Sequence, residues 1–150
     1  MSTQSRLVEV YTEVLSNRMG HDVRVGPAAI HFQPREDLNA QVILCERDPE
    51  YLCVRASFEA PEGPITPDEL LRICNNTTLR IKGVKSVVDS DGDIDFSIEM
   101  LVAAPDCLPS PDHLQAILPR ALSMLLCGIQ RTLTDIAISD VERAEFREDN

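Results

Sequence analysis

A chain of 150 residues carries a formal net charge of −11 at pH 7, contains no Trp and has only four Phe and two Tyr. This length predicts a single domain, residues 1–150, that buries about 68–70% of its unfolded surface and needs neither disulfide nor metal to fold. The charge argues against nucleic-acid and membrane partners, because phosphate backbones and anionic lipids repel it, and six aromatic rings are too few for a base-stacking platform.

The chain opens with a predicted helix over residues 5–19. Its apolar residues at helical spacing are Leu7, Val10, Tyr11, Val14 and Leu15. Gly20 is expected to end the helix, because Gly tolerates the left-handed conformation found after helix ends.

An interrupted strand pattern follows. Gly26-Pro27 breaks the alternation, so we expect one strand near 28–33, with a short preceding strand or a bulge at 22–27 as an open alternative. Residues 33–39 form a predicted polar connection. Two further strands and the turn between them are expected at Gln41–Arg47, Tyr51–Glu59 and Asp48–Glu50.

Two stretches of the chain repeat one pattern. Ala60–Leu70 returns as Ala104–Leu114, with the same Ala, Pro, Pro, Asp and Leu at equivalent positions. Each copy follows an alternating apolar run and predicts a proline-stiffened loop, then a helix that begins after Thr66 or Ser110 with Pro next. The repeat therefore predicts two hairpin-then-helix modules.

The first of these helices opens with the capping box Thr66–Glu69, whose hydroxyl and carboxylate satisfy the first amide groups. We expect Leu70, Leu71, Ile73 and Cys74 to share one face of this helix. We expect the helix to stop near Asn75–Thr78, because these side chains compete for backbone hydrogen bonds.

The second hairpin is predicted at Leu79–Val88 and Ile94–Ala103, with Asp89–Asp93 as its turn. The acidic turn resembles part of a calcium loop. With Gly92 at position 6, however, positions 1 and 12 are Val87 and Ile98, which cannot supply carboxylates. A solvated hairpin turn is the better interpretation.

A long helix is predicted from Ser110 over about 25 residues. Its apolar positions are Leu114, Ile117, Leu118, Ala121, Leu122, Leu125, Ile129, Leu133 and Ile136. Pro119 predicts a kink or a division into two helices. A charged tail from about residue 140 follows, where Ser139–Glu142 forms a second capping-box pattern that precedes a turn or two.

The cysteines and the N-terminus indicate the compartment. Five cysteines form no CxxC pair, and Cys107 alone lies outside a predicted strand or helix. We expect the other four, Cys45, Cys53, Cys74 and Cys127, to be small reduced core residues. No signal-peptide run and no window near 18 apolar residues occur, so a protein of the reducing cytoplasm is expected.

No motif in the sequence indicates catalysis. His21, His31 and His113 lie in different contexts without metal-ligand spacing, and GxSxG, GxGxxG and P-loop patterns are absent. We assign no catalytic, cofactor-binding or metal-binding residue and expect a protein that is not an enzyme. Leu101, Ile43 and Cys45 fall opposite the main alternation of their strands, and if they cluster they would mark an interaction surface.

The element order α-β-β-β-α-β-β-α resembles that of type III secretion chaperones and of the YbjN-like family, which is named for bacterial sensory-transduction regulation. The closest segment is Leu70–Leu118, with Asn75-Asn76 after the helix, the Asp91–Ile94 hairpin and the Ser110–Leu114 helix opening. The resemblance implies an α+β fold with an antiparallel sheet of about five strands.

The same resemblance implies a non-enzymatic, chaperone-like or regulatory protein of bacterial type that is often homodimeric and binds a protein partner or client. It assigns no partner-binding residue. Two alternatives remain open: a small-ligand sensor with a pocket between the sheet and the C-terminal helix, and a hydrolase that uses Cys/His groups or an Asp-bound metal.

Overall fold

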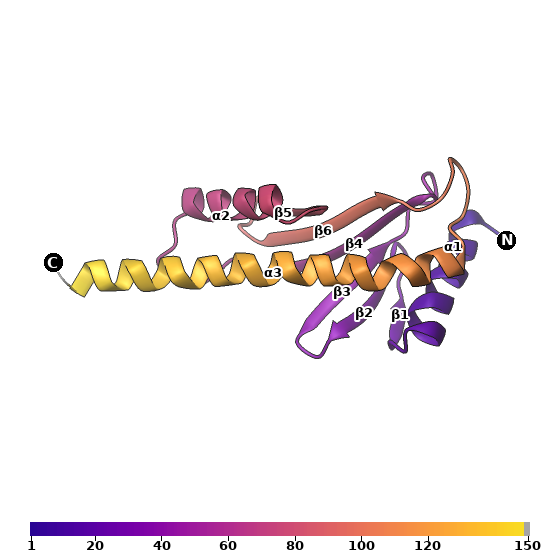
Figure 1. Cartoon of the computed structure of the whole chain (residues 1–150), viewed down its shortest axis with the longest axis horizontal. Coiled ribbons are helices and arrows are strands. Elements are labelled where there is room, and N and C mark those ends of the chain that lie inside the picture. Colours follow the sequence, from indigo (N-terminus) through magenta and orange to yellow (C-terminus); the bar gives the residue numbers. More distant parts are fainter. Residues whose placement is uncertain (149–150) are drawn as a thin grey trace. The chain divides into compact units, whose positions relative to one another are not determined.

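The computed structural model describes residues Met1–Glu148 and shows an α+β architecture (Figure 1). Its helices are α1 (Thr3–Thr12), the π-helical turn η1 (Glu13–Arg18), α2 (Pro67–Arg80) and α3 (Pro111–Glu148). Its strands are β1 (Val23–Val25), β2 (Ala29–Arg35), β3 (Leu38–Ile43), β4 (Tyr51–Phe58), β5 (Val84–Val88) and β6 (Ile94–Leu101). Within the described residues the strands form a six-stranded antiparallel sheet in the order β1-β2-β3-β4-β6-β5. The predicted fold class is confirmed, with six strands in place of five.

The sixth strand is β1, which pairs antiparallel with β2 and places Val25 opposite Ile30. The predicted polar connection over 33–39 is wrong, because β2 and β3 extend through most of it and leave a two-residue turn. Leu38 is buried, so β3 begins directly after the turn. At this turn Arg35 forms an ion pair with Asp37. The β2–β3 register shifts between Phe32 and Arg35, a stretch that contains Pro34, which has no N–H to donate.

The predicted helix over 5–19 is an α-helix followed by a π-helical turn. The N–H of Met19 donates to the Val14 carbonyl at 2.9 Å, five residues back. Gly20 follows with φ of +77°, so the predicted helix end at this glycine is confirmed.

Helix α2 begins as predicted, since Thr66 Oγ1 accepts the Glu69 N–H at 3.3 Å. The predicted end near Asn75–Thr78 is wrong, because α2 continues to Arg80. Two hydroxyls that were expected to disrupt it bind other elements instead. Thr77 Oγ1 lies 2.6 Å from Thr132 Oγ1 of α3, and Thr78 Oγ1 accepts the backbone N–H of Ser86 in β5 at 2.9 Å.

Helix α3 is continuous through Pro119, so the predicted division into two helices is wrong. Buried leucines on both sides of the proline, Leu118 and Leu122, hold the helix in place and offset the lost backbone bond. Ser139–Glu142 lies inside α3 and begins no helix, and the predicted charged tail is helical as far as Glu148. Its last two residues lie outside the described part of the chain.

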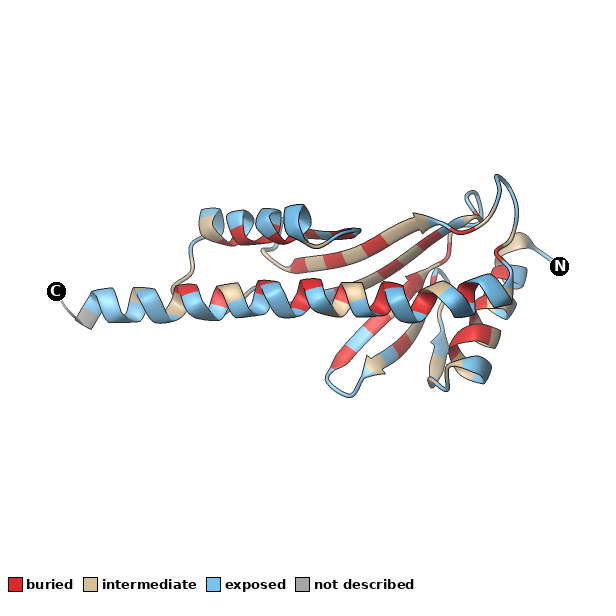
Figure 2. Cartoon of the chain, viewed as in Figure 1, coloured by how far each residue is buried: buried red, intermediate tan, exposed pale blue. Residues whose placement is uncertain are grey.

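The chain divides into two compact units. Unit 1 comprises Met1–Ala56 and Ser97–Ser123, and unit 2 comprises Ser57–Phe96 and the chain from Met124 onward. In unit 1 the sheet residues Ile30, Val42 and Val54 are completely buried. In unit 2 the core is smaller, and Figure 2 shows α2 buried on one side and exposed on the other.

Candidate protein-binding surface

Unit 2 exposes more large apolar side chains than unit 1 does. Among the described residues, unit 1 exposes Met1, Val25, Tyr51 and Leu101. Unit 2 exposes Leu71, Leu79, Val87, Leu133, Ile138, Val141 and Phe146. Exposed apolar groups that lie next to one another mark an interaction surface, so unit 2 holds the larger set of candidates for one.

Helix α2 carries two of these side chains at helical spacing. Leu71 is 52% exposed and Leu79 is 75% exposed, with the exposed Asn75 one turn from each. We call Leu71, Asn75 and Leu79 the α2 stripe. The prediction that Leu71 shares one helical face with Leu70, Ile73 and Cys74 is wrong. At about 100° per residue, Leu71 lies outside the arc centred on the other three, which are buried.

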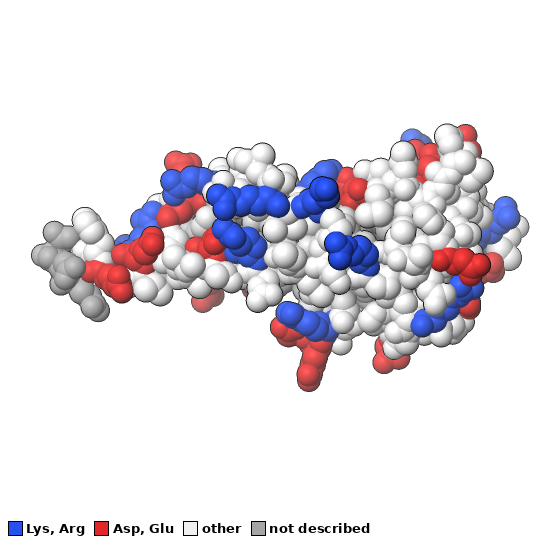
Figure 3. All heavy atoms as spheres, in the orientation of Figure 1, with Lys and Arg blue, Asp and Glu red and all other residues white. Residues whose placement is uncertain are grey.

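Charged side chains of both signs lie beside the α2 stripe. Arg72 and Arg80 are exposed on the same helix, as is Asp68 one turn before Leu71, and Arg72 Nη2 lies 3.8 Å from Glu69 Oε1. Figure 3 shows Lys and Arg over α2 and the neighbouring stretch of α3, with Asp and Glu nearby. The stripe therefore has a polar surround of mixed charge, in a chain whose net charge is −11.

Polar contacts hold the start of α2 on α3. The Arg143 Nε donates to Glu69 Oε2 at 2.7 Å, and the Ser139 hydroxyl donates to Glu69 Oε1. The bond from Ser139, followed by the ion pair with Arg143, holds the pKa of Glu69 below its ordinary value. These contacts fix the helix that presents the α2 stripe.

A close approach of α3 to β5 completes this packing. A Cβ atom added to Gly128 would lie 2.8 Å from Cγ1 of Val84 and 3.6 Å from Cγ2 of Thr77. Only a residue without a side chain allows this spacing. Unit 2 is thus closely packed on its inner side, while its outer side exposes several large apolar side chains.

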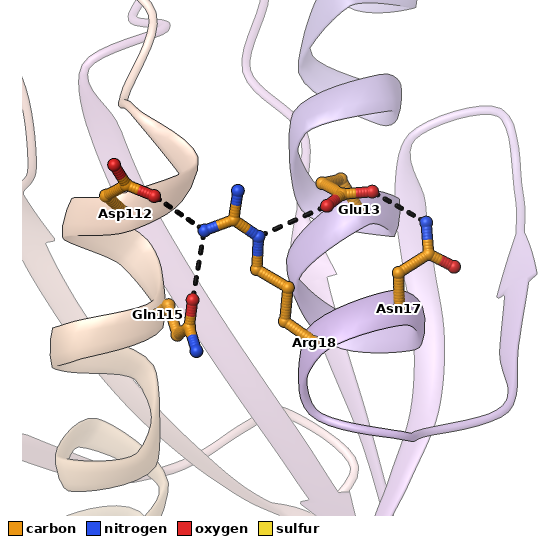
Figure 4. A network of polar contacts seen from close by, with 5 residues as sticks. All are labelled: Glu13, Asn17, Arg18, Asp112 and Gln115. Carbon is orange, nitrogen blue, oxygen red and sulfur yellow. Dashed lines mark hydrogen bonds and ion pairs between the residues drawn. The ribbon is translucent and has the colours of Figure 1, made fainter.

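Unit 1 uses polar contacts at the corresponding helix junction (Figure 4). The Arg18 Nη1 of η1 donates to Asp112 Oδ1 at 2.7 Å and to Gln115 Oε1 at 2.9 Å, both on α3. The Arg18 Nε donates to Glu13 Oε1 at 3.2 Å, while Asn17 donates to the second oxygen of Glu13 at 2.6 Å. The bond from Asn17, and after it the bond from Arg18, lowers the pKa of Glu13. This polar network joins η1 to the first two turns of α3.

The acidic turn Asp89–Asp93 uses its carboxylates within the turn. Asp89 Oδ1 accepts the N–H groups of Asp91 and Asp93, and Asp93 Oδ1 accepts the N–H of Ala60 at 2.7 Å. Gly92 has φ of +87°, as the hairpin requires. Among the described residues no three His, Cys, Asp or Glu side chains converge on a metal-sized site.

The three histidines do not converge. His21 packs on Phe32 with ring centroids 5.5 Å apart, and His113 lies in the first turn of α3. His21 and His31 both line an open hollow of about 720 Å³. The residues around this hollow are Gly20–Arg24, His31–Gln33, Asn39 and Ala40. None of them belongs to α3, where the ligand-sensor alternative places its pocket.

The five cysteines are free thiols, and they differ in exposure. Cys74 is a core residue as predicted, and burial raises the pKa of its thiol. Cys45 and Cys53 are half-buried. Cys127 is exposed, so its prediction as a core residue is wrong, because it lies on the side of α3 opposite the buried Leu125 and Ile129.

The three side chains that the sequence singled out as surplus apolar groups belong to unit 1. Leu101 is 71% exposed at the end of β6, while Ile43 and Cys45 are half-buried. The larger set in unit 2 could not be recognised from strand alternation, because most of it lies on helices whose inner faces also carry apolar residues.

Helix α3 is long and apolar enough to cross a membrane by length and composition alone. The core helix of a water-soluble protein meets the same criteria, and α3 buries Leu114, Leu118 and Leu125 completely. The absence of a membrane partner stays a prediction.

Comparisons with solved structures show similarity of fold. The crystal structure of the ExsC–ExsE complex matches with a TM-score of 0.58 and 15% sequence identity, over 84% of this chain and 90% of the other. The crystal structure of an uncharacterized protein from Methanothermobacter thermautotrophicus matches with a TM-score of 0.57 and 13% identity, over 85% and 97%. No protein family and no curated protein matches the sequence. The predicted likeness to the fold of type III secretion chaperones is confirmed.

Proposed function

We propose that this chain is a non-enzymatic protein-binding domain of chaperone-like or regulatory type, which binds its partner through the α2 stripe. The observation that carries the proposal is the concentration of exposed large apolar side chains in unit 2. Exposed apolar groups with a polar surround are typical of protein interaction sites. The similarity in fold to a protein solved in complex with another protein supports the same function.

The charges around the stripe define the chemistry of the partner. Arg80 follows Leu79 directly, so a segment with an apolar side chain next to Asp or Glu fits this end of the stripe best. At the other end Asp68 lies one turn before Leu71, and a basic side chain of the partner fits there.

We further propose that the protein acts as a homodimer in a bacterial cytoplasm and is related to the YbjN-like proteins. The five free thiols suit a reducing compartment. Light scattering across micromolar concentrations should give a mass of twice 16.7 kDa, and a monomer mass throughout would contradict the homodimer.

The binding site can be tested with a matched pair of variants. We expect the wild-type protein to slow aggregation of chemically unfolded citrate synthase, and Leu71→Ser with Leu79→Ser to remove most of this protection. The control is Leu101→Ser, because Leu101 is about as exposed as Leu79 but lies in unit 1. The proposed surface would be contradicted if the double variant and Leu101→Ser lost the same amount of protection. It would also be contradicted if the wild type did not slow the aggregation.

As a second candidate, we propose a small-ligand site in the hollow lined by His21 and His31, whose volume falls in the range of ligand sites; this place differs from the pocket between the sheet and α3 that the sequence suggested. A metabolite that stabilises the wild type but not a His31→Ala variant in thermal-shift screening would support it. Equal stabilisation of both would contradict a ligand site in this hollow.

A further inference from the structure

Helix α3 carries an exposed stripe opposite the face that it buries in unit 2. The buried positions are Leu125, Ile129, Thr132, Ile136 and Ser139. Exposed positions on the opposite side are Arg131, Thr134, Ile138, Val141 and Glu145. At about 100° per residue the two sets point in nearly opposite directions. We call the exposed set the outer stripe.

The outer stripe has the spacing of a helix–helix seam. Its members follow one another at intervals of three, four, three and four residues, which is the heptad pattern of paired helices. Ile138 and Val141 at its centre are 51% and 57% exposed. Ala137 and Ala144 lie beside them, and their small side chains allow a second helix to approach closely.

The charges of the outer stripe are related by symmetry about Ile138. Arg131 lies seven residues before Ile138 and Glu145 lies seven residues after it, each about 10.5 Å away along the axis at about 1.5 Å per residue. If two copies pack antiparallel with a twofold axis at Ile138, each Arg131 faces Glu145 of the other copy. In a parallel pair, Arg131 would face Arg131 and Glu145 would face Glu145, which is unfavourable.

We propose that a second copy of this chain packs antiparallel on the outer stripe, with Ile138 on the twofold axis. The inference rests on the proposed homodimer and names its interface. An isologous contact of this kind is self-complementary, and the apolar centre with oppositely charged ends has that property. The α2 stripe is on a different element and takes no part in the pairing.

Cysteine cross-linking tests the geometry. In a background with the exposed Cys107 and Cys127 changed to Ser, Ile138→Cys should form an intermolecular disulfide under mild oxidation, because position 138 meets its own copy. Leu133→Cys is the matched control, since it is exposed on the same helix but lies off the outer stripe. A mixture of Arg131→Cys chains and Glu145→Cys chains should cross-link, because these two positions face each other in the antiparallel pair. Arg131→Cys chains alone, or Glu145→Cys chains alone, should not cross-link, because the two equivalent positions of such a dimer lie much farther apart than the roughly 7 Å limit between Cα atoms.

Charge reversal tests the pairing in solution. Arg131→Glu and Glu145→Arg should each weaken dimerisation about tenfold, measured by sedimentation equilibrium, and the double reversal should restore most of it. Arg131 also forms an ion pair within the chain, with its Nε 3.0 Å from Asp135 Oδ2. Asp135→Asn is therefore the control, and it should leave the dimer intact.

The outcomes separate this inference from the proposed function. A dimer whose Ile138→Cys form does not cross-link, or whose double reversal restores nothing, overturns the α3 pairing and leaves the homodimer standing. A monomer at every concentration overturns both. If the protein is a monomer and binds another protein through Ile138, the outer stripe is not a dimer interface. The proposal of protein binding would then remain, and the α3 pairing would be wrong.

Discussion

The two units of this protein bury their apolar residues to different extents. Among the described residues, unit 1 has twenty buried apolar side chains and exposes four large ones, whereas unit 2 has nine and exposes seven. Both units pack α3 against strands of the sheet, so the kind of element does not explain the difference. Unit 1 covers more of its own apolar surface, and unit 2 leaves more of its apolar side chains exposed.

The repeated loop makes the comparison specific. Thr66 caps α2 in unit 2, and Ser110 Oγ accepts the His113 N–H at 3.1 Å at the start of α3 in unit 1. The local chemistry is the same in the two copies. The difference between the units therefore arises from what each helix packs against.

The largest expected effect comes from the core of unit 1. Leu118→Ala should lower the free energy of unfolding by about 2–5 kcal/mol, because it leaves a cavity at a side chain that is fully buried. Leu79→Ala in unit 2 should change it by less than about 0.5 kcal/mol. Urea denaturation followed by circular dichroism measures both, and equal losses would remove the contrast between the units.

A smaller effect is expected at the buried hydroxyl pair of unit 2. Thr77→Val should lower the free energy of unfolding by about 1–3 kcal/mol, because it leaves the Thr132 hydroxyl buried without its partner. Changing both residues to Val should be nearly neutral. A double-variant cost equal to the sum of the single costs would show that the pair does not act as one unit.

The two caps should have similar effects, although they belong to different units. Thr66→Ala and Ser110→Ala should each lower the free energy of unfolding by about 1 kcal/mol, since each removes a side-chain acceptor for a first-turn N–H group. Thermal unfolding of the two variants gives the comparison. A cost confined to one of them would show that the repeat is not equivalent in energy.

The smallest effect is expected at Glu69 of unit 2, as a change in how stability depends on pH. The folded-state pKa of Glu69 is lowered, chiefly by Ser139 and then by Arg143, so its stabilising contribution is present above the unfolded pKa and is lost as pH falls through the folded pKa. Glu69→Gln should therefore be less stable than wild type at pH 7, and the difference should shrink as pH falls below the ordinary Glu pKa of 4.5. A difference that stays constant with pH would contradict the role assigned to the charge.

Local sequence determined the starts of helices and the tight turns. The Thr66 and Ser110 caps, the helix end at Gly20 and the Asp89–Asp93 hairpin turn follow from hydrogen bonds within a few residues and from the backbone freedom of glycine. Interactions over such short distances do not depend on the rest of the fold, so residue types and spacing were enough to predict them. The α+β class followed in the same way from the alternation of strand and helix patterns.

Tertiary packing decided the features that the sequence did not. Helix α2 runs through Asn75–Thr78 because Thr77 and Thr78 find partners on α3 and β5, and α3 passes through Pro119 because buried leucines on both sides hold it. The outer stripe and the α2 stripe are exposed because, among the described residues, each helix is covered on one side and carries apolar residues on the other side too. Periodicity shows that a face is apolar, whereas only the packed structure shows whether another element covers it.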